Sequence, residues 1–166
     1  MRTTHVLAGG LAAALMVTVV LSELAKATPS SGSTSTVLGP PALFSPFKIK
    51  RKGPSEWGIE IEAKQGLEIV TQQIVFAVGA QSGWHTHPGP VFISVKEGTM
   101  TFYEEDCSSR VLSAGEGFLD VGEHAHLARN ESGAQATNIV TYFVPPNTPV
   151  AALRDSSPPQ PLNCPL

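Results

Sequence analysis

The sequence predicts an all-β fold, a small antiparallel β-barrel with irregular proline-rich extensions at both ends. Short apolar segments alternate with polar residues at a period of two, and turn residues separate these segments. No ten-residue stretch has convincing helical periodicity. Evenly spaced short strands over roughly a hundred residues are typical of a sandwich or barrel, and closure also removes exposed sheet edges.

The first 27 residues are typical of an export signal. Arg2 is followed by an apolar run over residues 6–21, and Ala25-Lys26-Ala27 matches the small-x-small cleavage pattern. The run is shorter than the ~20 residues that span a bilayer, so we expect cleavage rather than a retained anchor, and no stable membrane span afterwards. The expected location is secreted, periplasmic or at the cell envelope.

After the signal, the sequence divides into three parts. Residues 28–46 are rich in Ser, Thr, Pro and Gly and predict a flexible leader, residues 47–146 predict the barrel, and residues 147–166 predict a proline-rich tail on the surface. The expected strands are 58–62, 67–78, 90–96, 99–105, 117–121, 125–129 and 136–144. Glu97-Gly98 predicts a tight hairpin, and Val91, Ile93 and Val95 alternate onto one face.

Two cysteines, Cys107 and Cys164, remain after export to an environment where disulfides persist. If they are joined, the bridge closes a loop of over fifty residues, for which the chain-entropy model gives about 4 kcal/mol. We expect a structural clip that holds the tail to the barrel. The alternative, a reactive thiol, lacks an activating histidine or helix N-terminus nearby in the sequence.

The charge balance argues against nucleic acid as a partner. The formal net charge is −3, and the one cluster of basic residues is short, comprising Lys48, Lys50, Arg51 and Lys52. Such a cluster is typical of a solvated loop or of a strand edge that discourages edge pairing.

Histidine is the most informative residue type in this chain. Apart from His5 in the signal, all histidines fall in two His-x-His pairs, His85-Thr86-His87 and His124-Ala125-His126. In an extended strand, residues two apart share a face, so each pair can direct both imidazoles at one point. Because imidazole is the commonest side-chain metal ligand, the pattern predicts a metal site.

These residues resemble the two motifs of the cupin family. The first motif, G-x5-H-x-H-x3,4-E-x6-G, is matched by Gly79, His85, His87 and Gly98. The second, G-x5-P-x-G-x2-H-x3-N, is matched by Gly115, His126 and Asn130. The resemblance implies a barrel of six to eight strands with a pocket at one mouth.

The chain departs from the motifs at the metal-binding glutamate of the family, where it has Val91. Val121 and Glu123 also replace the proline and glycine of the second motif, with Gly122 displaced by one. His124 is the first candidate to replace the lost ligand, which would give a four-histidine site. Alternatively His124 lies in a turn and points to solvent; Glu123 is a weaker substitute because it alternates away from His126.

The resemblance implies a divalent cation, with iron, manganese, nickel, copper and zinc as candidates, and a small-molecule ligand or substrate. Two functions remain open: a metal-dependent oxidoreductase or dioxygenase, and a non-catalytic barrel that binds a metal or small ligand. The fold alone does not decide between them. Relatives of this kind also pair through strand exchange or sheet packing, so a homodimer is compatible with the sequence.

Overall fold

The computed structural model describes residues 27–164, so the expected export signal lies almost wholly outside the described residues. In chain order the strands are β1 (Ser31–Val37), β2 (Ala42–Phe44), β3 (Phe47–Lys52), β4 (Gly58–Ala63), β5 (Leu67–Gln81), β6 (Val91–Glu97), β7 (Thr99–Glu104), β8 (Ser109–Ser113), β9 (Gly117–Asp120), β10 (His126–Arg129) and β11 (Ala136–Val144), followed by the short 3-10 helix η1 (Val150–Ala152). Within residues 27–164, no helix is long and apolar enough to cross a bilayer.

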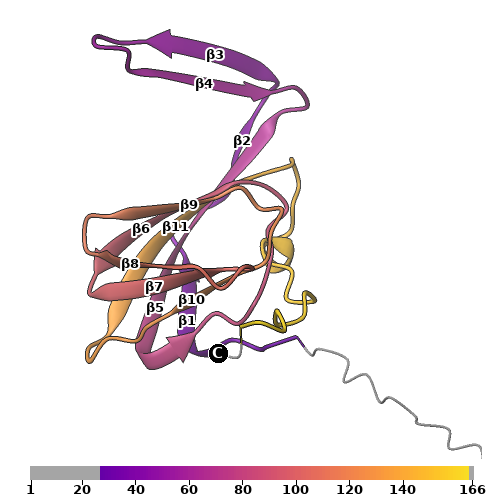
Figure 1. The fold of residues 1–166 in the computed structure, drawn as a ribbon. Coiled ribbons are helices and arrows are strands. Elements are labelled where there is room, and N and C mark those ends of the chain that lie inside the picture. Colours follow the sequence, from indigo (N-terminus) through magenta and orange to yellow (C-terminus); the bar gives the residue numbers. More distant parts are fainter. Residues whose placement is uncertain (1–26, 165–166) are drawn as a thin grey trace, which may run out of the picture.

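The main sheet is antiparallel and curls into a nearly closed barrel, which confirms the expected fold class (Figure 1). Its strands follow the order β8-β7-β10-β5-β11-β6-β9, and β1 and β2 pair with β5. The long strand β5 is therefore the centre of the sheet, with β11 running along it from Glu68 to Phe76.

The core follows from alternation along the strands. In β6, Val91, Ile93 and Val95 are buried while Phe92 and Ser94 face outward, as expected. Inside the barrel, Phe102 and Phe118 stack with ring centroids 4.8 Å apart. The turn after β6 has Gly98 at φ 76°, a backbone conformation that glycine adopts without strain.

The expected flexible leader contains two strands. β1 pairs with β5 from Val37 opposite Gln72 to Ser31 opposite Gln81, and β2 pairs with the start of β5. The composition of 28–46 suggested flexibility because serine and threonine supply little apolar surface. The edge of β5 opposite β11 supplies backbone partners instead. Ser35 Oγ also donates to Gln72 Oε1 at 2.9 Å.

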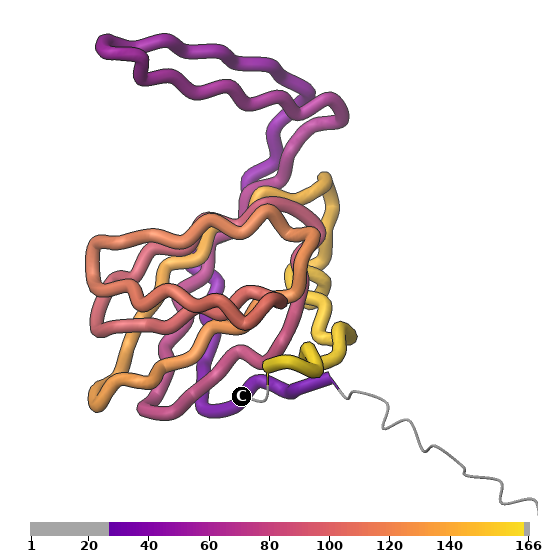
Figure 2. The backbone as a smooth tube through the Cα atoms, viewed as in Figure 1, coloured from indigo at the N-terminus to yellow at the C-terminus, as the bar shows by residue number. Residues whose placement is uncertain are grey.

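The strands β3 and β4 do not belong to the barrel sheet, although the barrel was expected to begin at residue 47. They pair only with each other, as a two-stranded sheet. Figure 2 shows this hairpin, which we call the arm (β3 and β4 with their connecting turn), reaching away from the barrel on a narrow neck formed by β2 and the start of β5. Strand β8 was also absent from the expectations, since its short polar-ended sequence has a weak alternation signal.

Candidate metal site

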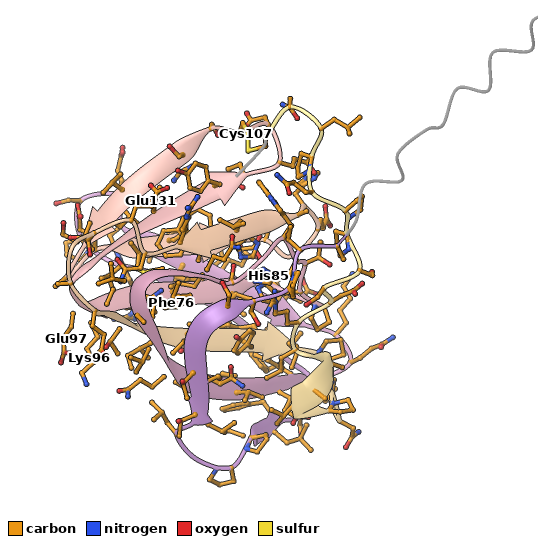
Figure 3. The ribbon with its side chains drawn as sticks, turned by 90° about the horizontal axis from the view of Figure 1, so that it is seen from below. Phe76, His85, Lys96, Glu97, Cys107 and Glu131 are labelled. Carbon is orange, nitrogen blue, oxygen red and sulfur yellow. A yellow bond between two sulfur atoms is a disulfide. The ribbon has the colours of Figure 1, made fainter. Side chains whose placement is uncertain are left out.

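The fold brings three of the four candidate histidines together inside the barrel. His85 and His87 follow β5, and His126 begins β10. The backbones of His85 and His126 hydrogen-bond to each other in both directions, at 3.1 and 3.0 Å. The side chains of His85, His87 and His126 are buried, and one ring nitrogen of each, able to act as a metal ligand, lies within 4.8 Å of the others. In Figure 3, His85 lies among the side chains that fill the barrel.

Backbone carbonyls fix the orientation of two of these rings. His85 Nδ1 lies 2.8 Å from the carbonyl oxygen of Gly83, and His87 Nδ1 lies 2.6 Å from that of Leu153. A carbonyl oxygen only accepts hydrogen bonds, so each Nδ1 is assigned as the N–H donor. The lone pair of each Nε2 is then available, as in histidines that bind metals.

Burial keeps all three imidazoles neutral. Desolvation lowers the pKa of His85 well below its ordinary value and the pKa of His126 to about 3. Desolvation also lowers the pKa of His87, against the opposing effect of its hydrogen bond to Leu153. Neutral imidazole is the form that coordinates a metal, so this environment favours ligation.

His124 lies outside this cluster. Its side chain is 61% exposed, and its Nδ1 lies 3.1 Å from Glu105 Oε1. The same-face rule holds only along an extended strand, but β10 starts at His126, and residues 122–124 form a bend in which Gly122 has φ 96°. The structure therefore does not form the four-histidine site, and the alternative of a solvent-facing turn residue describes His124.

A buried carboxylate that the sequence analysis missed faces the cluster. Asp120, the last residue of β9, is only 6% exposed. Its Oδ2 lies 3.4 Å from His126 Nδ1 and 3.9 Å from His87 Nε2, while its Oδ1 accepts the Gly122 N–H at 3.0 Å. Desolvation raises the pKa of Asp120, and the hydrogen bond from Gly122 opposes this rise.

The alternation of β9 contained a signal for Asp120. Phe118 and Asp120 are two residues apart and are both buried, whereas Leu119 between them faces outward. An acid that shares the inward face with a core phenylalanine therefore marks an interior polar group. Asp120 pairs across the sheet with Val91, the position at which the glutamate of the family motif is missing.

The C-terminal tail forms part of the site, contrary to the expectation that it only lies along the surface. Leu153 is buried in the core, and its carbonyl oxygen accepts from His87. Thr86 and Asp155 exchange two backbone hydrogen bonds of 3.0 Å, and Arg154 donates to the carbonyl of Ser82. The expected bridge between Cys107 and Cys164 is present and attaches the end of this tail to the barrel.

Asn130 of the second motif has a structural role close to the site. It is fully buried, and its amide donates to the carbonyls of Phe76, Ala77 and Ala134 at 2.8–3.1 Å. Its Oδ1 accepts from Ser132. These bonds hold the turn that follows β10 against β5.

A small cavity adjoins the three histidines. Its volume is about 40 Å³, and its lining also includes Ser82, Phe102, Asn138 and Tyr142. Burial raises the pKa of Tyr142 to about 12, so its hydroxyl stays protonated. Pockets for drug-sized ligands typically measure ~300–1,000 Å³, so this space suits an ion and a ligand of water size.

Comparison with known proteins supports the motif assignment. Residues 72–149 match the model of the Cupin_2 family, described as a cupin domain. This range includes both His-x-His pairs, Asp120 and Asn130. No curated protein sequence matches the chain.

Several solved structures are similar to the chain at low identity. The Cupin_2 domain of an XRE family transcriptional regulator from Enterobacter cloacae is 17% identical, with a TM-score of 0.47 over 70% of this chain and 100% of that one. A cupin superfamily protein from Desulfitobacterium hafniense is 10% identical, with a TM-score of 0.43 over 46% and 67% of the two chains. A DMSP lyase from Ruegeria pomeroyi is 18% identical, with a TM-score of 0.45 over 49% and 41%. The family match and the two motifs carry the assignment: residues 72–149 are a cupin domain.

Proposed function

We propose that this chain is an exported cupin that binds one divalent cation through His85, His87 and His126. The observation that carries the proposal is the convergence of three buried, neutral imidazoles, with two ring orientations fixed by carbonyls. A cation also fits the polar atoms left without partners, because Asp120 Oδ2 and His126 Nδ1 are buried and form no hydrogen bond within the described part of the chain.

Bound at these residues, a divalent cation would supply Lewis acidity and open coordination positions for a co-ligand. Imidazole suits iron, manganese, nickel, copper and zinc alike. The protein's part is to orient the ligand rings, to keep them unprotonated and to limit what reaches them. Since the adjoining cavity holds about 40 Å³, we propose water, O₂ or a small anion as co-ligand rather than a large substrate.

Among enzymes, a metal-dependent oxidoreductase or dioxygenase that acts on a small molecule fits best. The competing function is a binding module that holds the metal or a small ligand without turnover. The small cavity and the tail over the site favour binding, whereas the buried and unpartnered Asn138 Oδ1 in the cavity wall offers an acceptor for a protic co-ligand.

Metal content tests the proposal directly. The mature protein, isolated from its exported location without added metal, is expected to carry close to one equivalent, measured by elemental mass spectrometry. Substituting His87→Ala or His126→Ala should remove this metal. Substoichiometric metal that is unaffected by both substitutions would contradict the proposal. Oxygen consumption and product formation with a panel of small acids and phenols then separate enzyme from binding module.

Export is proposed on two observations, the signal-like first 27 residues and the disulfide between Cys107 and Cys164. The disulfide is compatible with an oxidising compartment outside the cytoplasm. N-terminal sequencing of the exported protein tests the cleavage, which is expected after Ala27. A retained N-terminus would instead indicate an anchor.

We also propose that two copies of the chain associate through the arm. One face of the arm is mostly apolar, with Ile49 opposite Ile61 and Arg51 opposite Ile59, while the other carries Lys48 and Lys50 paired with Glu62 and Glu60. A two-stranded hairpin is marginally stable alone in water, so an apolar face on it calls for a covering surface. A second copy offers one, because Phe92, Leu119 and Phe143 form an apolar patch on the outside of the barrel.

A further inference from the structure

Asp120 has a buried carboxylate oxygen, Oδ2, that no other group in the described residues satisfies. The residue is almost fully buried, and no hydrogen-bond donor in residues 27–164 reaches its Oδ2. Its ion-pair neighbours within the described residues are only His87 and His126, and both contacts are to the same oxygen, Oδ2. Buried charges in proteins are paired with other charges or bound to metals, so an unpaired carboxylate in this position calls for a cation.

The distances around Oδ2 fit a cation shared with His87 and His126. Two ligand atoms that each lie about 2.1 Å from one metal at a tetrahedral angle are about 3.4 Å apart. Oδ2 lies 3.4 Å from His126 Nδ1 and 3.9 Å from His87 Nε2. The contact to His126 is not a hydrogen bond, because both atoms remain without a hydrogen-bond partner. A cation between these atoms would satisfy both.

The backbone holds Asp120 ready for this role. The Gly122 N–H occupies Oδ1, which directs Oδ2 toward the histidines. Gly122 accepts from the His87 N–H in turn, at 3.2 Å, so the turn after β9 connects the carboxylate to the first His-x-His pair. A side chain at Gly122 would meet the carbonyl oxygen of Gly89 at 2.7 Å, so the turn depends on glycine.

We propose that Asp120 is the fourth protein ligand of the metal site and supplies, from β9, the carboxylate that is lacking at Val91 on β6. The two positions are direct cross-strand neighbours, so a carboxylate from either can reach the same interior region. The site then has three imidazoles and one carboxylate, and its ligand charge offsets half of the charge of a divalent cation. This inference rests on the proposed function, because it assumes that the histidines bind a metal.

Cobalt titration of the metal-free mature protein tests this proposal. The probe is Co²⁺, whose visible absorption reports ligand type and coordination number. For Asp120→Asn, which keeps the shape but loses the charge, we expect the Co²⁺ affinity to fall by about 100-fold and the visible spectrum to change. In the double variant with Asp120→Ala and Val91→Glu, a glutamate on the neighbouring strand should recover at least about tenfold of this loss.

Glu123→Gln is the matched control, since Glu123 lies next to His124 but is exposed. It removes one nearby negative charge without touching the site, so its affinity and spectrum should equal those of the unmodified protein. Unchanged binding by Asp120→Asn would overturn the proposal. A loss below tenfold with an unchanged spectrum would also overturn it, because Asp120 would then act only at a distance.

Two measurements keep the outcomes distinct. If Asp120→Asn does not fold, difference infrared spectra of the unmodified protein with one equivalent of Zn²⁺ give the answer: a shifted carboxylate stretch supports ligation, and none contradicts it. If His87→Ala and His126→Ala abolish binding while Asp120→Asn leaves it intact, only this inference fails. If the unmodified protein binds no metal, both the proposed function and this inference fail.

Discussion

The barrel interior and the arm depart in opposite ways from the rule that apolar side chains are buried and polar ones exposed: the barrel buries polar groups, and the arm exposes apolar ones. In the barrel, Asp120 and His126 are only 6% and 2% exposed, and one atom of each, Oδ2 and Nδ1, has no hydrogen-bond partner within residues 27–164. In the arm, Ile49 and Ile59 are apolar side chains that are 48% and 45% exposed. Buried polar groups and exposed apolar surfaces are the two observations that carry information about function, because each is costly unless something covers it.

The two regions therefore call for different partners. A buried carboxylate and a buried imidazole, each with one atom that has no hydrogen-bond partner in the described residues, call for a cation, which needs little space. An apolar hairpin face needs a surface of comparable size, which only another protein region supplies. Charged pairs on the opposite face of the arm, between Lys48 or Lys50 and the acids of β4, keep that side in solvent. Each region can be tested without disturbing the other.

The largest expected effect concerns the disulfide that attaches the C-terminal tail to the barrel. Replacing Cys107 and Cys164 by serine removes a bridge across a sequence separation of 57 residues. The chain-entropy model then gives a loss of about 4 kcal/mol in the free energy of unfolding, measured by denaturant titration. The tail carries the Leu153 carbonyl that orients His87, so metal affinity should also fall. An unchanged unfolding midpoint would show that the tail docks without its clip.

The second effect is stabilisation by metal. At a free metal concentration about 100 times the dissociation constant, binding stabilises the native protein by about 2.7 kcal/mol. We expect this gain in the unmodified protein, measured as a shift in thermal unfolding on metal addition, and its loss on addition of a chelator. In His126→Ala the shift should disappear. A full shift in that variant would place the metal elsewhere, and the polar groups of the barrel would need another explanation.

The parts of the fold that sequence could predict are those set by local pattern. The alternation of Val91, Ile93 and Val95 and the turn at Gly98 follow from a period of two and from turn chemistry, whereas the grouping of His85 and His87 with His126 was expected from the resemblance to the cupin motifs. The disulfide followed from there being only two cysteines in the exported part. The alternation and the turn need no knowledge of distant segments.

The features that sequence could not predict depend on long-range partners. β1 forms because β5 presents a free edge, although its own residues suggested flexibility. The carbonyl of Leu153 reaches His87 only because the tail folds back over the barrel. His124 turns outward because a bend precedes β10, and Asp120 enters the site from a different strand than the motif glutamate. The structure therefore brings three of the four candidate histidines together and places beside them a buried carboxylate that the sequence analysis did not include.

The third prediction concerns the arm. Ile49→Asp places a charge on its apolar face and should weaken self-association at least tenfold, measured by sedimentation velocity across concentrations. The free energy of unfolding of the barrel should change by less than about 0.5 kcal/mol, because the arm is a separate two-stranded sheet. Lys52→Gln is the matched control, since it changes the net charge by the same amount and residues 49 and 52 point to opposite faces of β3. Equal effects of both variants would argue that net charge, not the apolar face, governs association.

The smallest expected effect belongs to His124, which lies close to the site in sequence but has an exposed side chain. Its contact with Glu105 is an exposed ion pair, and such pairs contribute little because solvent screens them. His124→Ala should therefore change the free energy of unfolding by less than about 0.5 kcal/mol and metal affinity by less than about twofold. Isothermal titration with the same metal as for His126→Ala gives the comparison. A tenfold loss would mean that the bend before β10 closes when metal binds and brings His124 inward. The carboxylate of Asp120 would then have a competitor for the fourth position, and the matched histidine variants would show which of the two the cation selects.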